Sequence, residues 1–263
     1  VKNPFAPLSA KHSNSLATVL AQEMQRFNKL LGVLTTSLEK LQNAVRGLVI
    51  MSPELEDMYN ALRNNQVPQM WAANAYPSLK PLASWMSDFK ERFFFFNNWL
   101  REGQPSCFWL SAFFFPQGFM TAALQNHARA NSIPIDQLMF RFHLLKALDE
   151  KDVEGNVPDG VLVKGLFIEG AAWDLTLGRL VESRTGEMYS QLPVIHFSPS
   201  KLADPSPELY QCPVYKTAVR AGTLSTTGQS TNFLVHLGLP FQQGTTADLW
   251  VLRGVAALCA PPE

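Results

Sequence analysis

The sequence predicts an α+β fold, with an N-terminal helical bundle that contains one long helix, followed by a small antiparallel β-barrel. Two observations predict this fold. Apolar residues recur at every third or fourth position over residues 16–48, which is the period of a helix. From about residue 140 the pattern changes to short alternating or β-branched runs that are separated by turn residues. The change divides the protein into a helical part, residues 1–145, and a β part, residues 146–263.

The first predicted helix carries a heptad-like apolar stripe, which consists of Leu16, Leu20, Met24, Phe27, Leu31, Leu34, Leu38, Leu41, Val45 and Leu48. At about 1.5 Å per residue it would extend roughly 50 Å, so it must lie across a neighbour or form one wall of a bundle. Gly32 in its middle costs about 1 kcal/mol relative to alanine, so tertiary contacts must stabilise the helix. A core helix is favoured over a free coiled coil, because the stripe ends after about four heptads.

Further helices are predicted before residue 139. Ser52 can cap the next helix, because Pro53 suits a first turn and the acidic residues that follow face the positive end of the helix dipole. Two more helices are predicted at about residues 82–101 and 116–130, and the segment "SIPIDQL" adds a short helical turn. Everything up to about residue 139 is therefore expected to be helical.

The rest of the sequence is expected to form strands. Candidate strands are residues 140–145, 160–171, 179–183, 192–197, 214–218, 232–239 and 249–257. No helical pattern lies between them, which favours an antiparallel meander or a small barrel over a parallel sheet with crossover helices.

The composition excludes several classes of function. The 22 basic and 22 acidic residues give a formal net charge of zero, so no basic field argues for nucleic acid. The most apolar stretch, residues 108–119, is interrupted by Ser111, Pro116 and Gln117 and is too short to span a membrane. The three cysteines are far apart, which predicts reduced, buried thiols in an intracellular protein. Because the sequence begins with valine in mid-pattern, we expect it to be part of a longer protein.

The loop "GTLSTTGQSTN", residues 222–232, resembles a phosphate cradle or a serine-nucleophile loop. A Walker loop needs a lysine after its second glycine, but Gln229 follows Gly228. Ser225 or Ser230 could act as a nucleophile only with a base such as histidine; any of the five histidines could approach them in the folded protein, but no spacing in the sequence requires it. We interpret the loop as a β connection whose hydroxyls satisfy backbone groups at a barrel corner.

No other motif indicates chemistry. The sequence has no HxxxH, HxH or CxxC pattern, and the acidic residues at 149–154 are typical of a solvated linker. We therefore predict no catalytic residue, no cofactor and no metal site. The aromatic runs "RFFFFNNWL" and "CFWLSAFFFPQGF" are too apolar to be fully exposed. They either fill the centre of the helical bundle, which is the favoured interpretation, or dock on a partner, and both can hold for different rings.

Ordered motifs over nearly the whole sequence, from about residue 13 to Cys259, resemble the C-terminal region of dynein heavy chains. "SLATVLAQE" begins the series, and "DGVLVKGLFIEGAAWD", "YQCPVYKTAVRAGTLSTTGQSTNF" and "WVLRGVAALC" complete it. "FWLSAFFFPQGFMTAALQNHAR" is similar to the most specific signature of the axonemal branch. The protein is therefore identified as a member of that family, in its axonemal branch.

The resemblance implies a definite context. Dynein heavy chains are ATP-driven, minus-end-directed microtubule motors built on a ring of six AAA+ modules, and this region follows the sixth. ATP and Mg²⁺ are bound in the ring, and microtubules are bound at a distant stalk, so this segment is expected to hold neither cofactor nor catalytic site. The expected partners are the AAA+ ring of the same heavy chain and, through the parent, other axonemal dynein subunits, without nucleic acid or membrane. The expected location is the cytoplasm and cytoskeleton, in the axoneme of a cilium or flagellum.

Within that context the segment is expected to be a non-catalytic cap that packs on the ring and modulates motor output. The residues predicted to dock on the ring are Leu16, Leu20, Phe27, Leu31, Leu34, Leu38 and Leu41. The alternative is a docking platform for a neighbouring axonemal or regulatory protein, without effect on the ATPase. Two assignments remain open for the first 50 or so residues, which belong either to the junction with the sixth AAA+ module or to the cap itself.

Overall fold

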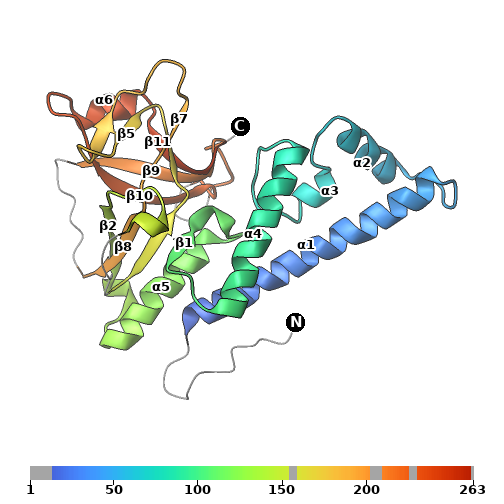
Figure 1. Ribbon diagram of the computed structural model, residues 1–263, viewed down its shortest axis with the longest axis horizontal. Coiled ribbons are helices and arrows are strands. Elements are labelled where there is room, and N and C mark those ends of the chain that lie inside the picture. Colours follow the sequence, from blue (N-terminus) through green and yellow to red (C-terminus); the bar gives the residue numbers. More distant parts are fainter. Residues whose placement is uncertain (1–13, 154–158, 202–208, 225–229, 262–263) are drawn as a thin grey trace.

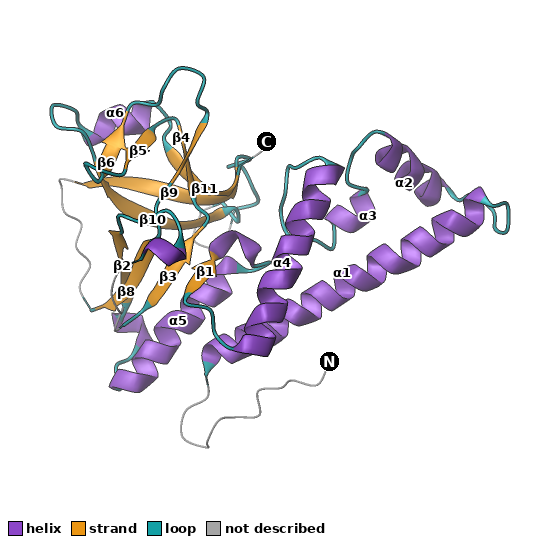
Figure 2. Ribbon diagram, viewed as in Figure 1, coloured by secondary structure: helices purple, strands orange, loops and turns teal. Residues whose placement is uncertain are grey.

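The computed structural model describes residues 14–153, 159–201, 209–224 and 230–261. A helical part and a β part lie side by side (Figure 1). The long helix α1, Ser15–Val45, extends away from the sheets, and α2, Pro53–Arg63, lies at its far end. Helix α5, Pro116–Asn131, packs on α1 and lies beside the sheets (Figure 2). The predicted α+β class, with a helical region at the N-terminal side, is therefore confirmed.

The helices begin and end close to the predicted residues. Asn14 caps α1 by accepting from the Leu16 amide at 3.0 Å, and Ser52 caps α2 as predicted, by accepting from the Leu55 amide at 3.4 Å. Proline begins α2 and α5 in the first turn. The remaining helices are α3 (Gln69–Ala72), α4 (Leu82–Glu102) and α6 (Ala247–Leu252), with 3₁₀ turns at η1 (Leu110–Ala112), η2 (Ile135–Gln137) and η3 (Glu150–Asp152).

The described strands form three sheets. They are β1 (Cys107–Trp109), β2 (Met139–Leu144), β3 (Val161–Lys164), β4 (Phe167–Glu169), β5 (Ala172–Asp174), β6 (Arg179–Val181), β7 (Tyr189–Gln191), β8 (Ile195–Ser200), β9 (Leu209–Thr217), β10 (Phe233–Pro240) and β11 (Ala256–Ala260). One sheet has the order β1-β3-β8-β2, a second has the order β10-β9-β11-β4-β7, and β5 pairs with β6.

The finer prediction of a closed antiparallel barrel is not confirmed. Strand β1 pairs with β3 in parallel, and β11 pairs with β9 in parallel, so the sheets are mixed. None of the sheets closes on itself within the described residues. The sequence pattern identifies short strands, but it does not specify their partners, because pairing depends on contacts between residues that are distant in the sequence.

Two predicted elements are wrong. Residues 107–109 form strand β1 within the stretch that was expected to be helical. The predicted strand at 249–257 is instead helix α6 followed by β11. Gly254, at φ 65°, ends α6, and the Gly254 and Val255 amides donate to the last helical carbonyls. A short apolar run has no period that separates a buried helix from a buried strand. Elements α3, β5 and β7 were not predicted.

The predicted strand at 160–171 is divided into β3 and β4 by Gly165, which has φ 87°. A side chain at this position would overlap the indole of Trp109, so both the turn and the close approach require glycine. Strands β1 and β2, which precede residue 145, pair with β3 and β8, which follow it. The division at residue 145 stays a prediction, but the two parts share one sheet.

The two aromatic runs form most of the core between the helical part and the sheets. Phe96, Trp99, Phe108, Phe113 and Phe119 are buried and contact one another, and the centroids of the Phe113 and Phe119 rings are 4.6 Å apart. The preferred core interpretation is therefore confirmed for these rings. Three others, at Phe93, Phe94 and Phe115, are exposed. Burying these large rings contributes apolar stabilisation to this junction.

Candidate functional site

The predicted ring-docking residues do not form one exposed face. Leu16, Leu20, Phe27, Leu34 and Leu41 are buried in the core of this protein, and Leu31 is half-buried against the same core. Only Leu38 is exposed, at 44%. The five buried side chains contact their own domain, because α2, α3, α4 and α5 all pack on α1. Docking through α1 stays a prediction, and the structure leaves Leu38 as the member of the predicted set that a partner could contact.

Sequence reasoning missed Glu23, which anchors the N-terminal half of α1 to another segment of the protein. Its carboxylate is buried and accepts from the Phe114 amide at 2.6 Å and the Phe115 amide at 3.2 Å. Arg26, on the next turn, donates to the same carboxylate at 2.9 Å. Burial raises the pKa of Glu23, although these hydrogen bonds and the guanidinium of Arg26 oppose the rise. The carboxylate joins α1 to the segment between η1 and α5, where it satisfies two backbone amides.

Glu23→Gln is expected to remove a pH dependence of stability. Because the folded-state pKa of Glu23 lies above its ordinary value of 4.5, the folded protein binds the proton more tightly than the unfolded protein. The wild-type free energy of unfolding should therefore contain a contribution that is complete below about pH 4.5 and is lost as the pH rises through the folded-state pKa. Denaturant unfolding at a series of pH values measures it.

Glu39→Gln is the matched control for this prediction, since Glu39 lies exposed on the same helix. It should keep the wild-type pH profile, whereas the Glu23→Gln profile should be flatter above pH 4.5. Identical profiles for Glu23→Gln and the wild type would contradict the role assigned to this carboxylate.

The far end of α1 carries an exposed apolar surface, which we call the distal apolar patch. It consists of Leu38, Val45, Leu48, Val49, Ile50, Met51 and Tyr59, with exposed fractions from 39% for Met51 to 91% for Ile50. Leu38, Val45 and Tyr59 line an open groove of about 850 Å³ between α1 and α2, whose rim carries Arg46 and Arg63. Clustered exposed apolar side chains of this kind mark interaction surfaces in soluble proteins. Sequence reasoning did not identify this surface; the run "VRGLVIM", in which apolar residues continue beyond the end of the helix, is the signal that could have indicated it.

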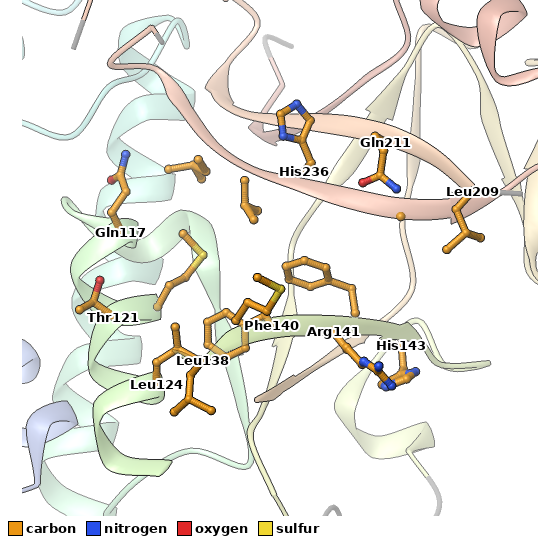
Figure 3. A pocket seen from close by; sticks show the side chains of 16 residues that line it. Gln117, Thr121, Leu124, Leu138, Phe140, Arg141, His143, Leu209, Gln211 and His236 are labelled. Atoms are coloured by element: carbon orange, nitrogen blue, oxygen red, sulfur yellow. The ribbon is translucent and has the colours of Figure 1, made fainter. Parts of the chain in front are cut away.

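A second groove, which we call the edge groove, lies between β2 and β10 and has a volume of about 790 Å³ (Figure 3). Gln117 and Thr121 of α5 lie at one end, and His143 and Leu209 lie toward the other. Its lining is mostly apolar and includes Phe140. No sequence pattern indicated this groove, because its two strands are almost a hundred residues apart in the sequence.

Residues 225–229 of the loop at 222–232 lie outside the described residues, and they include Ser225. At the described base of the loop, the Thr231 amide donates to the Thr223 carbonyl at 3.0 Å, and Ser230 Oγ accepts from the Asn232 amide at 3.1 Å. Arg220 donates to Glu169 at 2.5 Å and to the Gly254 carbonyl at 2.7 Å. These contacts agree with the interpretation as a β connection, because the hydroxyls and the guanidinium bond to the protein itself.

Cys107, Cys212 and Cys259 are free and buried, as predicted. Burial raises the pKa of each thiol to about 12, which keeps the nucleophilic thiolate scarce at neutral pH. In the part of the protein that the structure describes, no group of three or more His, Cys, Asp or Glu side chains is arranged to hold a metal ion. Over the same residues, no helix has both the length and the apolar character needed to cross a membrane.

Comparison with known proteins agrees with the resemblance found in the sequence motifs. The family model for the C-terminal domain of dynein heavy chains matches residues 2–259. Axonemal heavy chain 6 of Homo sapiens is 47% identical over 269 residues, and axonemal heavy chain 1 of Rattus norvegicus is 46% identical over 250, each alignment covering 95% of this protein. Axonemal heavy chain 3 of Homo sapiens is 44% identical over 249 residues, which is 94% of this protein. In each case the sequence spans only 6% of the length of the relative.

Proposed function

The protein belongs to the family of C-terminal domains of dynein heavy chains, and from that premise we propose that it is the non-catalytic cap of an axonemal heavy chain. The cap packs on the AAA+ ring of the same heavy chain and modulates the output of the motor in a cilium or flagellum. It binds no ATP or Mg²⁺ of its own in this proposal, since the ring supplies both. Other axonemal subunits and the microtubule are then reached only through the rest of the parent protein.

The observation that carries the proposal is the distal apolar patch. Helix α1 projects away from the sheets (Figure 1). The exposed residues of the patch lie at its C-terminal end, on the loop that follows it and on α2. Leu48, Val49 and Ile50 are each more than 45% exposed, and an exposed apolar surface of this kind is costly in water unless another surface covers it. The large remaining part of the parent heavy chain is a covalently attached, and therefore concentrated, source of such a surface.

The proposed mechanism is mechanical. Buried contacts with α2, α3, α4 and α5 hold α1 along its length, so a load applied at the patch is transmitted to the helical core. Nucleotide-driven rearrangement of the ring would change how well the patch is covered. A difference in contact free energy of about 1–3 kcal/mol between two ring states is sufficient to bias the populations of those states.

Replacing Leu38 and Val45 together by aspartate in the full-length heavy chain is expected to change motor output. Both side chains are exposed, so the substitutions leave the core intact, but they place two charges in the apolar groove between α1 and α2. A lost coupling of about 1–3 kcal/mol changes the ratio of ring states by about 5–150-fold. We expect this shift to alter microtubule-gliding velocity or microtubule-stimulated ATPase, and both are measured.

The matched control replaces Thr36 and Asn43 by aspartate. Both are exposed on the same helix, neither lines the groove, and the change in charge is identical. The control should move and hydrolyse ATP as the wild type does. If the patch variant also gives wild-type velocity and ATPase, the proposal of docking through the patch is wrong.

Point variants are preferable to removal of residues 146–263. Strand β1 would lose its partner β3, and β2 would lose its partner β8, so deletion would damage the helical part as well. A change in motor output after such a deletion would therefore not identify the surface that is responsible.

A second candidate function is a docking platform for another axonemal or regulatory protein, without effect on the ATPase. The edge groove favours it, because α5, β2 and β10 line this groove and none of them carries the distal apolar patch (Figures 1 and 3). Under this function, variants in the edge groove would lose a protein partner and leave gliding velocity and ATPase unchanged.

A further inference from the structure

The groove between α1 and α2, which we call the helical groove, is lined by apolar side chains from both helices. Leu38 and Val45 lie two turns apart on α1, and Tyr59 and Leu62 lie one turn apart on α2. Leu38, Val45 and Tyr59 are exposed, whereas Leu62 is partly buried and Leu41, which also lines the groove, is buried in the core. The exposure of these side chains shows that no described segment of the protein covers the groove.

The walls of the helical groove determine which kind of backbone can bind there. Both walls are α-helices, so along their length the backbone amides and carbonyls are already bonded within each helix. An extended segment in the groove would bury its own backbone groups without partners, which is unfavourable. A helix satisfies its backbone groups internally, so the groove favours a helical occupant.

The dimensions of the helical groove match a short helix. Helix α2 has 11 residues and is therefore about 16 Å long, and Leu38 and Val45 are about 10 Å apart along α1. A helix of about 11–14 residues spans this length and presents three or four apolar side chains on one face. Such a helix would pack its side chains between the rows that α1 and α2 form, as the third member of a helical bundle does.

Two arginines give the helical groove a positive rim. The charged side chains that line it are Arg46, Arg63 and Glu39, and all three are exposed. Neither guanidinium makes an ion pair or a hydrogen bond among the residues that the structure describes. Arg46 caps α1 and Arg63 ends α2, and the chain turns back between these helices, so the two arginines lie toward opposite ends of the groove (Figure 1). An occupant with a carboxylate near each end would pair with both.

The small size of the helical groove favours an occupant that is tethered to the protein. A separate helix of three to four turns would bind weakly, because association costs translational and rotational freedom and little surface is buried. The sequence spans 6% of the length of its relatives, so a full-length heavy chain carries many other segments in the same molecule. A covalent link can raise the effective concentration of such a segment to about millimolar, which is sufficient to fill a weak site.

We propose that the helical groove binds one amphipathic α-helix of about three to four turns from the part of the same heavy chain that lies outside this sequence. The apolar face of that helix would cover Leu38, Val45 and Tyr59, and its carboxylates would pair with Arg46 and Arg63. The inference rests on the proposed function, because it names the kind of element in the parent heavy chain that covers this part of the distal apolar patch.

The first measurement places a photoreactive benzoylphenylalanine at Tyr59 of the purified full-length heavy chain. The replacement keeps an aromatic ring in the groove, and mass spectrometry identifies the peptide to which it cross-links. We expect one dominant cross-link within the same molecule, to a segment with apolar residues at helical spacing and acidic residues beside them. The matched control carries the same group at Asp57, which is exposed on the same helix and does not line the groove. It should not label that segment.

The second measurement uses the cross-linked segment as a synthetic peptide, together with the 263-residue protein. Fluorescence anisotropy follows binding, and circular dichroism follows helix formation. Proline in the middle of the peptide should weaken binding about a hundredfold relative to alanine at the same position, because proline interrupts a helix.

The third measurement tests the positive rim. The double variant Arg46→Glu/Arg63→Glu should weaken binding of the same peptide about 2–30-fold, which is the effect of two exposed ion pairs. The matched control is Lys29→Glu/Lys40→Glu, which makes the same change in charge at exposed positions of α1 outside the groove. Salt screens these more distant charges, so the control should change binding by less than about twofold.

Several outcomes would overturn the inference. One is the absence of a cross-link from Tyr59 within the heavy chain, and another is a cross-link to a second copy, seen as a dimer. A third is equal binding of the proline and alanine peptides, which would identify an extended occupant, and a fourth is equal binding by the two charge-reversed variants. If any of these occurs while the Leu38 and Val45 variant still alters motor output, docking through the patch is retained and only the acidic helical occupant is wrong.

Discussion

Arg92→Ala is expected to lower the free energy of unfolding by about 3–5 kcal/mol, because it removes the closer of the two cations that bind the buried carboxylate of Asp88 and leaves only Lys80, at 3.4 Å. Arg92 is 2% exposed and donates from Nε to Asp88 at 2.6 Å. Its guanidinium also donates to the Ser111 carbonyl and lies 3.7 Å from the centroid of the Tyr76 ring. Chemical denaturation, followed by circular dichroism, measures the loss.

The expected effect is large because Arg92 joins the helical part to the sheets. The Ser111 hydroxyl lies within hydrogen-bonding distance of the carbonyls of Gly165, at 3.0 Å, and of Cys259. Arg92 on α4 thus bonds to a residue that contacts both the β3–β4 turn and the last strand. Loss of the guanidinium removes several charge-assisted hydrogen bonds at this junction at once.

Two controls separate this effect from a general loss of helix stability. Lys90→Ala, at an exposed position of α4, should change the free energy of unfolding by no more than about 0.5 kcal/mol. The double variant Asp88→Leu/Arg92→Met, which removes both charges, should be less destabilised than the sum of its single variants. Additive effects, or a cost below about 1 kcal/mol for Arg92→Ala, would show that the pair is not coupled as the contacts suggest.

Phe27→Ala is expected to cost about 3–5 kcal/mol of stability, because Phe27 lies in the aromatic core. It is 3% exposed, and its ring centroid lies 4.9 Å from Phe114, 5.3 Å from Phe96 and 5.8 Å from Phe89. The sequence pattern predicted Phe27 as a docking residue, and the core position predicts a different result. Loss of stability in the isolated protein, measured by thermal or denaturant unfolding, distinguishes the two.

The matched control is Phe94→Ala, the same substitution at a side chain that is 58% exposed on α4. We expect it to change the free energy of unfolding by no more than about 0.5 kcal/mol, since it removes little buried surface. Comparable losses for the two variants, or wild-type stability for Phe27→Ala, would contradict the assignment of Phe27 to the core.

The local elements of this protein could largely be predicted from its sequence. The period of the apolar residues predicted α1, and Ser52 with Pro53 predicted the start of α2, because capping and first-turn preferences act within a few residues. The ordered motifs predicted the family. Strand β1 and helix α6 could not be predicted, because both are short apolar runs whose form is decided by distant partners.

The amino-acid pattern alone establishes that α1 has an apolar stripe, whereas the folded structure establishes what covers it. Periodicity fixes which residues share a face of a helix, but it does not say whether the same protein or a partner buries that face. Phe27 and Leu34 are covered by the protein's own helices, whereas Leu38 and Val45 line the open groove between α1 and α2 and stay exposed. In the same way, alternation predicted β2 and β10, but their free edges follow from pairings between segments far apart in the sequence, and such pairings exist only once the protein has folded.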